Sequence, residues 1–210
     1  MLSSRSLLSI LVCTSTFAAA ADAAPAPAFG ARKLDPAKPL PAGVKAKGTQ
    51  VREAWTWTNP DGAPGYLVLS VTSNARTVSR QLYAQVYGGK QPRELRLVKD
   101  GLSNCKLDLV ANFLAGSVSI DDIDGDGTPE IAFAYDVVCS ATADPVPRKL
   151  IILEGGAKYA LRGRGMGKDP DDKVIGGEYK ADAFKGAEAI GTWAEARWKE
   201  LLAHEPTVFE

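Results

Sequence analysis

The sequence predicts a mainly β protein of the α+β class, in which an antiparallel meander forms a sheet or a sandwich with one C-terminal amphipathic helix. Between residues 51 and 161 the chain contains short runs in which aromatic and β-branched residues alternate with polar ones. This alternation has the period of a β-strand. Turn-forming residues separate these runs at regular intervals. Beyond residue 182 the apolar residues change to a helical period.

Five strands are predicted in the first half of the meander. The first, at residues 51–57, ends at the turn sequence Asn-Pro-Asp-Gly of residues 59–62. Alternating apolar residues then mark the other four strands, which cover residues 66–72, 78–86, 95–97 and 107–111. Such regularly spaced strands favour an antiparallel sheet, a sandwich or an open barrel.

The second half of the chain supplies further strands and the helix. Residues 117–120 and 131–138 flank an acidic loop, and residues 150–153 and 159–161 flank a Gly-Gly dipeptide that suits a tight hairpin. Residues 163–177 are rich in Gly, Lys and Asp, and we expect a mobile loop there. Asp182 is the predicted N-cap of the helix, whose apolar face contains Phe184, Ala187, Ile190, Ala194, Trp198 and Leu201. Trp198 and Phe184 are expected to anchor the core.

Residues 1–23 have the features of a secretory signal peptide. Arg5 precedes an apolar stretch at residues 6–20 that is short for a bilayer span, and residues 21–23 (Ala-Asp-Ala) fit the small-x-small rule for cleavage. We therefore expect an exported chain, in the periplasm or secreted, that begins at Ala24 and has no membrane span after cleavage.

Two other fates of the N-terminus are disfavoured, namely lipidation of Cys13 and a retained anchor helix. Lipidation needs a small residue before the cysteine, and Val12 stands there. Residues 24–47, rich in Ala, Pro and Lys, are expected to form an extended and poorly ordered leader. Residues 48–210 are then a single β-rich domain.

The charge balance argues against a nucleic-acid partner. The chain has 25 Lys and Arg residues and 25 Asp and Glu residues, and no basic cluster stands out along the sequence. Nucleic-acid-binding proteins neutralise phosphates with clustered Lys and Arg.

Cys105 and Cys139 remain after removal of the signal peptide. Export would place them where thiols are oxidised, so we predict a disulfide between them. Closing this loop would stabilise the fold by roughly 3–4 kcal/mol in the chain-entropy model. Two separate buried thiols are the alternative. Neither cysteine has the spacing of a redox or zinc motif.

A histidine-dependent active site is not expected. The only histidine, His204, follows the predicted helix, which is a poor place for the histidine of a catalytic triad. One histidine is also too few to supply the ligands of a zinc hydrolase. A carbohydrate-active hydrolase that uses acidic residues is the alternative function. Asp108, Asp136 and Glu154 could serve it if they face one cleft. Their spacing singles out none of them, so no catalytic residue is assigned.

Aromatic residues on the predicted strands offer a second route to carbohydrate binding, because exposed rings can stack on sugars. On alternating strands, core positions are favoured instead. The residues concerned are Trp55, Trp57, Tyr66, Tyr83 and Tyr87.

One motif carries chemistry, the segment Asp-Ile-Asp-Gly-Asp-Gly-Thr-Pro-Glu at residues 122–130. Calcium takes six or more oxygen ligands, and alternating acids in a tightly wound loop can point inward together. Gly127 permits the sharp bend of the backbone. The predicted calcium ligands are Asp122, Asp124, Asp126, the carbonyl oxygen of Thr128, and Glu130, either directly or through water.

Without an ion these carboxylates would repel one another, which favours a bound cation over an empty turn. A solvated acidic turn is the alternative, and magnesium or manganese are the other candidate ions. The loop is not an EF-hand: its twelfth position is Phe133, where an EF-hand has an acid, and both flanks predict strands.

The acidic loop resembles the strand-loop-strand calcium sites of integrin-type FG-GAP and VCBS propeller repeats, whose pattern is Asp-x-Asp-x-Asp-Gly-x-x-Asp followed by an aliphatic residue. Glu130 stands where those repeats usually have Asp, and Ile131 is the aliphatic residue. The motif occurs once and no repeat of blade length is visible, so a full propeller is not expected.

A longer resemblance runs from Cys105 through the acidic loop to residues 159–163 (Tyr-Ala-Leu-Arg-Gly), and again at residues 177–180 (Gly-Glu-Tyr-Lys). In these segments the chain resembles small exported bacterial proteins catalogued under surface polysaccharide biosynthesis. That resemblance implies a role at the cell envelope, with a cell-surface polysaccharide or an envelope protein as partner. The expected function is an exported calcium-binding β-domain without an assigned reaction.

Overall fold

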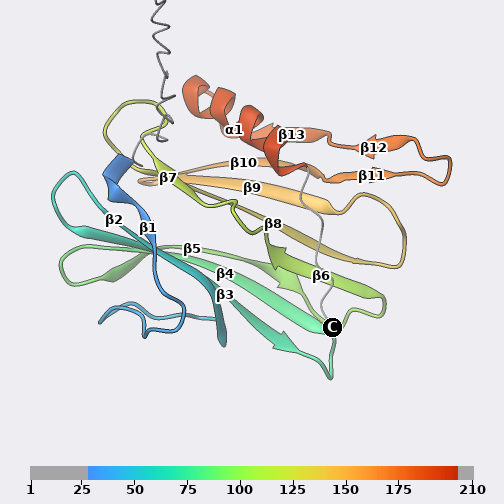
Figure 1. Cartoon of the computed structure of the whole chain (residues 1–210), viewed down its shortest axis with the longest axis horizontal. Coiled ribbons are helices and arrows are strands. Elements are labelled where there is room, and N and C mark those ends of the chain that lie inside the picture. Colours follow the sequence, from blue (N-terminus) through green and yellow to red (C-terminus); the bar gives the residue numbers. More distant parts are fainter. Residues whose placement is uncertain (1–27, 203–210) are drawn as a thin grey trace, which may run out of the picture.

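Two antiparallel β-sheets face each other in the computed structural model, which describes residues 28–202 (Figure 1). The first, sheet A, follows a short 3-10 turn, η1 (Ala28–Gly30), and has its strands in chain order. They are β1 (Arg32–Lys33), β2 (Gln50–Thr58), β3 (Pro64–Asn74), β4 (Ser79–Gly88) and β5 (Arg93–Leu102). Strands β2 to β5 are the first four strands of the predicted meander, and the fifth, predicted at residues 107–111, is β6 (Asp108–Phe113), which belongs to the second sheet.

The second sheet, sheet B, has the order β13-β10-β9-β8-β6, and β7 also pairs with β8. A separate two-stranded ribbon, β11-β12, extends beyond this sheet. The elements are β6 (Asp108–Phe113), β7 (Ser119–Asp121), β8 (Glu130–Ser140), β9 (Pro147–Glu154), β10 (Ala157–Arg164), β11 (Met166–Lys168), β12 (Val174–Gly176), β13 (Tyr179–Asp182) and the helix α1 (Glu188–Leu201). The mainly β fold with one C-terminal helix is confirmed.

Strand β8 shows how the period of two divides the core. Phe133 and Tyr135 point between the two sheets, where they pack with residues of β2 to β5. Ala132 and Ala134 point to the other face of sheet B, against α1. Successive side chains of a strand leave opposite faces, so sheet B is apolar on both faces and lies between sheet A and the helix.

The helix covers the outer face of sheet B with the predicted apolar stripe. Ile190, Ala194, Trp198 and Leu201 are buried there. Phe184, before the helix, is half-buried and stacks on the Tyr159 ring, with 5.5 Å between ring centroids. These contacts agree with core roles for both aromatic residues.

The predicted N-cap was wrong. The helix begins at Glu188, and Ala187 is its N-cap, without a capping side chain. Asp182 instead ends β13, where it lies opposite Ala160 of β10 and accepts a hydrogen bond from Arg162. Pairing with β10 holds the backbone at Asp182 in a strand, and local sequence does not reveal that pairing.

The mobile loop predicted at residues 163–177 was also wrong, because this segment ends β10 and contains the ribbon β11-β12. Met166 and Val174 are both exposed. None of the residues of β11 and β12 is fully buried, so the ribbon needs no apolar alternation and its sequence resembles that of a loop.

The prediction of a poorly ordered leader fails from residue 28 onward, and its residues 24–27 lie outside the described residues, as does the predicted signal peptide. Strand β1 pairs with β2. Beyond it, the chain crosses the outer face of sheet A, where Val44 packs with Val68 and Tyr87. These few apolar residues lack periodicity, so the sequence gives no sign of order here. They are ordered because they pack on the strands of sheet A.

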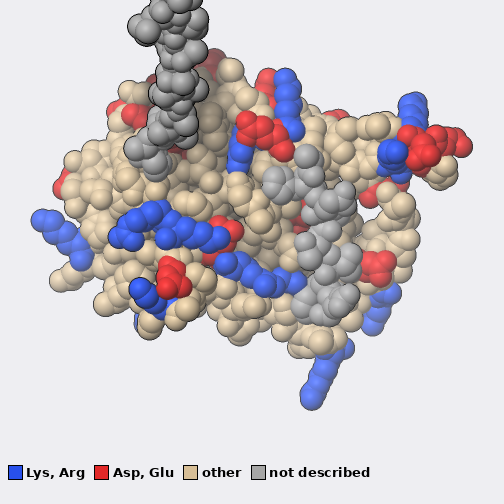
Figure 2. Space-filling model, viewed as in Figure 1, with Lys and Arg blue, Asp and Glu red and all other residues tan. Residues whose placement is uncertain are grey.

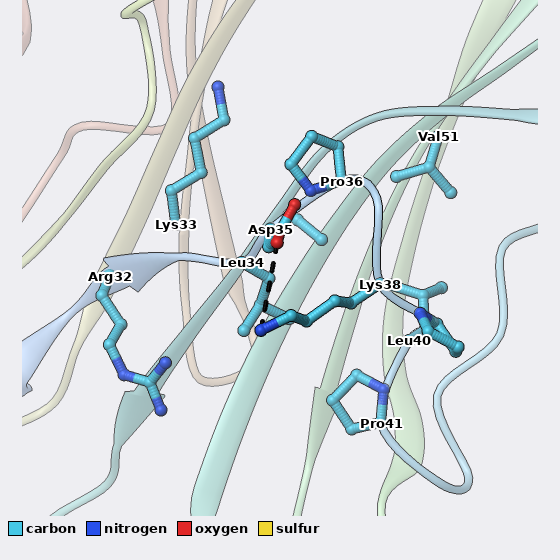
Figure 3. Close-up of a pocket in the computed structure, with 11 residues that line it drawn as sticks. Arg32, Lys33, Leu34, Asp35, Pro36, Lys38, Leu40, Pro41 and Val51 are labelled. Atoms are coloured by element: carbon cyan, nitrogen blue, oxygen red, sulfur yellow. Dashed lines mark ion pairs between the residues drawn. The ribbon is translucent and has the colours of Figure 1, made fainter.

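The same segment borders a hollow of about 540 Å³ at the β1 side of sheet A (Figure 3). Lys38 and Asp35 form an ion pair across it, with Nζ and Oδ2 4.0 Å apart. Both side chains are largely exposed, so this pair adds little stability.

The predicted disulfide between Cys105 and Cys139 is present. It joins the connection between β5 and β6 to strand β8, and Cys105 packs in the core between the sheets. The crosslink therefore ties the end of sheet A to sheet B. Among residues 28–202, no helix has the length and apolar character needed to cross a membrane.

A buried ion pair holds α1 to sheet B. The Arg148 guanidinium donates to both carboxylate oxygens of Asp136 at 2.9 Å, and it also donates to the carbonyl oxygen of Leu201 at the end of the helix. Arg148 and Asp136 are almost wholly inaccessible. Removing one partner would leave the other charge buried, which typically costs several kcal/mol.

The variant Arg148→Met is therefore expected to lower the free energy of unfolding by about 3–5 kcal/mol, measured by urea denaturation. The double variant Arg148→Met/Asp136→Leu should recover part of the loss, because it leaves no unpaired buried charge. Arg164→Gln, at an exposed arginine, is the control. A double variant no more stable than Arg148→Met would contradict this account of the pair.

Candidate metal centre

The acidic loop joins two strands of sheet B, as the sequence predicts. Strand β7 pairs with β8 in the register Asp121 to Glu130, so residues 122–129 form the connection of a hairpin. Gly125 and Gly127 have φ angles of 80° and 84°. Both lie in the left-handed region that favours glycine, which confirms the bend expected at Gly127.

Backbone N–H groups hold three carboxylates of the loop in place. Asp122 accepts a hydrogen bond from Gly127 at 3.1 Å, Asp124 accepts one from Asp126 at 3.1 Å, and Asp126 accepts one from Thr128 at 2.6 Å. Each bond uses one oxygen of its carboxylate. The loop thus winds around its own acids, as a calcium loop must do to gather ligands.

Glu130 is the most constrained acid of the group. It begins β8, and its side chain has no accessible surface. One carboxylate oxygen accepts a hydrogen bond from the backbone N–H of Ile123, while the other, Oε1, is buried and has no hydrogen-bond partner. A buried charged oxygen without a partner is costly, so a cation would relieve a defect that the protein alone leaves.

Burial raises the pKa of Glu130 to about 7, and the nearby carboxylates of Asp124, Glu154 and Asp122 add to the shift. The hydrogen bond from Ile123 acts in the opposite direction. Low exposure to water and nearby like charges both raise the pKa of a carboxyl group. Both are present when acids gather without a cation.

Two groups of three carboxylates come within ligand distance of each other. In one, the ligand oxygens of Asp122, Asp124 and Glu130 lie within 4.8 Å of one another, and in the other, those of Asp124, Asp126 and Glu154 do. Oxygens on opposite sides of a calcium ion are separated by about 5 Å. Both groups are therefore compact enough to hold one ion, and Asp124 belongs to both.

Four of the five predicted ligands contribute a carboxylate to these groups. The fifth, Thr128, lies in the loop and donates its N–H to Asp126. Glu154 was not predicted as a ligand. It ends β9, which pairs with β8 up to Ile131 and Leu153, and one further step of that register brings Glu130 beside it. The only signal that could have revealed it is this pairing of strands.

The position of Glu154 is fixed by Tyr159 of β10, whose hydroxyl donates to its carboxylate at 2.9 Å. Burial and this bond raise the pKa of Tyr159 to about 12, and the negative charges of Asp124 and Glu130 contribute. Tyr159 in turn stacks on Phe184. The acidic centre is therefore connected by direct contacts to the segment that leads into α1.

The acidic centre has no cationic partner in the described part of the chain. Among residues 28–202, no Lys or Arg forms an ion pair within 4.0 Å of the acids at positions 122, 124, 126, 130 and 154. Like charges held this close are unfavourable, so the arrangement is suited to a divalent cation with oxygen ligands.

The acids considered for a hydrolase do not converge. Asp136 is fully buried in its ion pair with Arg148, Asp108 is exposed on β6, and Glu154 lies with the acidic loop. The aromatic residues considered for sugar stacking are at least half-buried: Trp57 and Tyr87 are in the core, and Trp55, Tyr66 and Tyr83 are intermediate. His204 lies outside the described residues.

Comparison of the chain with protein-family models, with curated proteins and with solved structures gave no match in any of the three.

The raised pKa of Glu130 gives a pH dependence with a definite sign. In calcium-free buffer, the folded state binds the Glu130 proton more tightly than the unfolded state does. The stability that this provides is complete below pH 4.5 and is lost as the pH rises through about 7.

The melting temperature without calcium should therefore fall more steeply over this range in the wild type than in Glu130→Gln, whose side chain does not titrate. Thermal unfolding followed by circular dichroism at several pH values measures both slopes. Equal slopes for the two proteins would show that the Glu130 pKa is not raised.

Proposed function

We propose that this chain is an exported β-domain that binds one calcium ion at the acidic loop, where the ion stabilises the fold. The observation that carries the proposal is the Glu130 carboxylate, which is inaccessible to water and has one oxygen, Oε1, without a hydrogen-bond partner. Its ligand oxygen lies within 4.8 Å of those of Asp122 and Asp124.

A calcium ion would supply what this centre lacks. It would partner the buried oxygen of Glu130 and offset the repulsion among the surrounding carboxylates. The proposed ligands are the carboxylates of Asp122, Asp124, Asp126, Glu130 and Glu154, together with the carbonyl oxygen of Thr128. Calcium accepts such sets of six to eight oxygens in flexible geometry, whereas magnesium needs a near-ideal octahedron.

The ion would act as a structural crosslink. Asp122, Asp124 and Asp126 belong to the loop, Glu130 to β8 and Glu154 to β9. Binding only the folded form, calcium stabilises it by an amount that grows with the ratio of free ion to dissociation constant. No reaction is assigned, because Asp108 and Asp136 do not converge with Glu154.

Export is supported by the disulfide and by the N-terminal sequence. Disulfides persist in oxidising compartments such as the periplasm, and the Cys105–Cys139 disulfide packs with the core between the sheets. A role at the cell envelope, with a surface polysaccharide or an envelope protein as partner, is part of the same proposal and rests on the resemblance of residues 105–163 and 177–180.

Calcium should raise the melting temperature of the wild-type protein, and chelator should reverse the rise. At a free calcium concentration of 100 times the dissociation constant, the expected stabilisation is about 2.7 kcal/mol. The variant Asp124→Ala should abolish the response, because Asp124 belongs to both groups of ligands.

Asp171→Ala, at an exposed acid of the β11-β12 turn, is the matched control and should respond as the wild type does. Differential scanning calorimetry with calcium, magnesium and chelator makes the comparison. A wild-type protein that melts at the same temperature with calcium and with chelator would remove the calcium assignment.

Glu154→Gln tests the ligand that comes from outside the loop. The amide keeps the side-chain volume and can still accept the hydrogen bond from Tyr159, but it lacks the charge. Calcium affinity, measured by isothermal titration calorimetry, should fall by about tenfold, which corresponds to about 1.4 kcal/mol. Glu178→Gln, at an exposed glutamate, should leave the affinity unchanged.

If wild-type protein and Glu154→Gln bind calcium equally, Glu154 is not a ligand and the site consists of the loop and Glu130. If neither binds, the proposed function itself fails.

A further inference from the structure

The inner face of strand β10 is apolar and buried at its centre and carries exposed basic residues on either side. Ala160 belongs to the core between the sheets, but Lys158 and Arg162, which share its face, are exposed. They lie at the margin of the sandwich, where the inner face of β10 meets solvent. Two other cations point to the same margin, Lys149 from β9 and Arg96 from β5.

These four residues, Arg96, Lys149, Lys158 and Arg162, form what we call the basic cluster. Strand pairing places them together: Lys149 lies opposite Arg162, and Lys158 lies opposite Leu153, next to the Gly155 turn. Arg96 reaches across from sheet A and donates to the carbonyl oxygen of Ala157 at 3.1 Å. Figure 2 views the molecule from the side of β1, the edge of sheet A opposite to β5, and Lys and Arg side chains lie beside Asp and Glu side chains on that face.

The protein neutralises this cluster only in part. Lys149 binds Asp100, with Nζ and Oδ2 2.5 Å apart, and Arg162 binds Asp182 at 2.6 Å. Lys158 makes no ion pair with any of residues 28–202. Four positive charges thus face two negative ones, and the excess lies at Lys158 and Arg96.

The electrostatic balance at Lys158 agrees with this count. Its pKa is lowered, first by partial burial and then by the charges of Arg162, Arg96 and Lys149, and only Asp100 opposes them. An ammonium group held among three other cations is stabilised by any anion that enters between them.

We propose that Lys158, Arg96 and Arg162 form a binding site for a carboxylate or phosphate group of an anionic ligand. This site is independent of the proposed calcium centre. Arginine offers a planar fork of N–H donors that matches the oxygens of such groups, and lysine adds a compact charge. Ala157 takes only one of the donors of Arg96.

The two sites lie on opposite faces of the same strands. On β10, Tyr159 points outward to the acidic centre while Lys158 and Arg162 point inward. Occupation of one site therefore does not block the other. An anion can reach the basic cluster from solvent, because Lys158 is exposed.

The test is an NMR titration of the purified chain with inorganic phosphate in calcium-free buffer at constant ionic strength. We expect saturable shifts in residues 157–163. Lys158→Gln should weaken phosphate binding by about fivefold. Asp182→Asn should strengthen it by about twofold, because it frees Arg162 from its exposed partner.

Lys90→Gln, at an exposed lysine of the β4-β5 turn, is the control for loss of net charge and should bind phosphate as the wild type does. Amide spectra confirm that each variant is folded. The proposal is overturned if wild-type protein shows no saturable binding, if Lys158→Gln binds as well as Lys90→Gln, or if Asp182→Asn binds more weakly than the wild type.

A second titration, with a linear oligosaccharide of uronic acids, identifies the source of the anionic group. If the oligosaccharide binds more tightly than phosphate and this binding is lost in Lys158→Gln, the result supports the site and assigns the anionic group to a polymer. Phosphate binding that depends on Lys158, with the oligosaccharide no tighter, supports the site for a small anion. Oligosaccharide and phosphate binding that are both insensitive to Lys158→Gln would overturn it.

Discussion

The pairing of β8 with β9 is the constraint on which the rest of the structure depends. It sets the inner residues of sheet B against sheet A and the outer ones against α1. It also brings Glu130 beside Glu154, and Arg148 beside Asp136. Because successive side chains leave opposite faces, a slip of one residue would turn all these groups to the wrong face at once. The bulk of Phe133 and the buried ion pair specify the register.

The two buried carboxylates of β8 illustrate two solutions to the same problem. Asp136 is paired with Arg148, so its charge is balanced within the protein. Glu130 receives one backbone N–H and otherwise faces other acids. A charge taken out of water needs a partner, and at Glu130 a divalent cation is the partner of suitable chemistry. The acidic centre and the ion pair lie on the same face of sheet B, which α1 covers, so the charge balance at both affects how the helix packs.

The largest errors in the sequence-based prediction share one cause. The segment from residue 28 to residue 47, the ribbon β11-β12 and strand β13 all lack apolar periodicity, and each is ordered by contact with a distant strand or by its own backbone pairing. Period-based reasoning detects segments that bury one face, as in β2 to β6 and in α1. It cannot detect segments whose order comes from neighbours far away in the sequence.

The sequence by itself determined the strand period, the turns, the apolar stripe of the helix and the spacing of Asp122, Asp124 and Asp126, because these are local properties of the chain. It also indicated the disulfide, through the cysteine count and the export expected from residues 1–23. Only the tertiary structure decided that Glu154 joins the acidic centre, that Asp136 pairs with Arg148, and that Arg96 contacts Ala157, next to Lys158. Each of these depends on which strands lie side by side, and that is set by the packing of two sheets and a helix rather than by any short stretch of sequence.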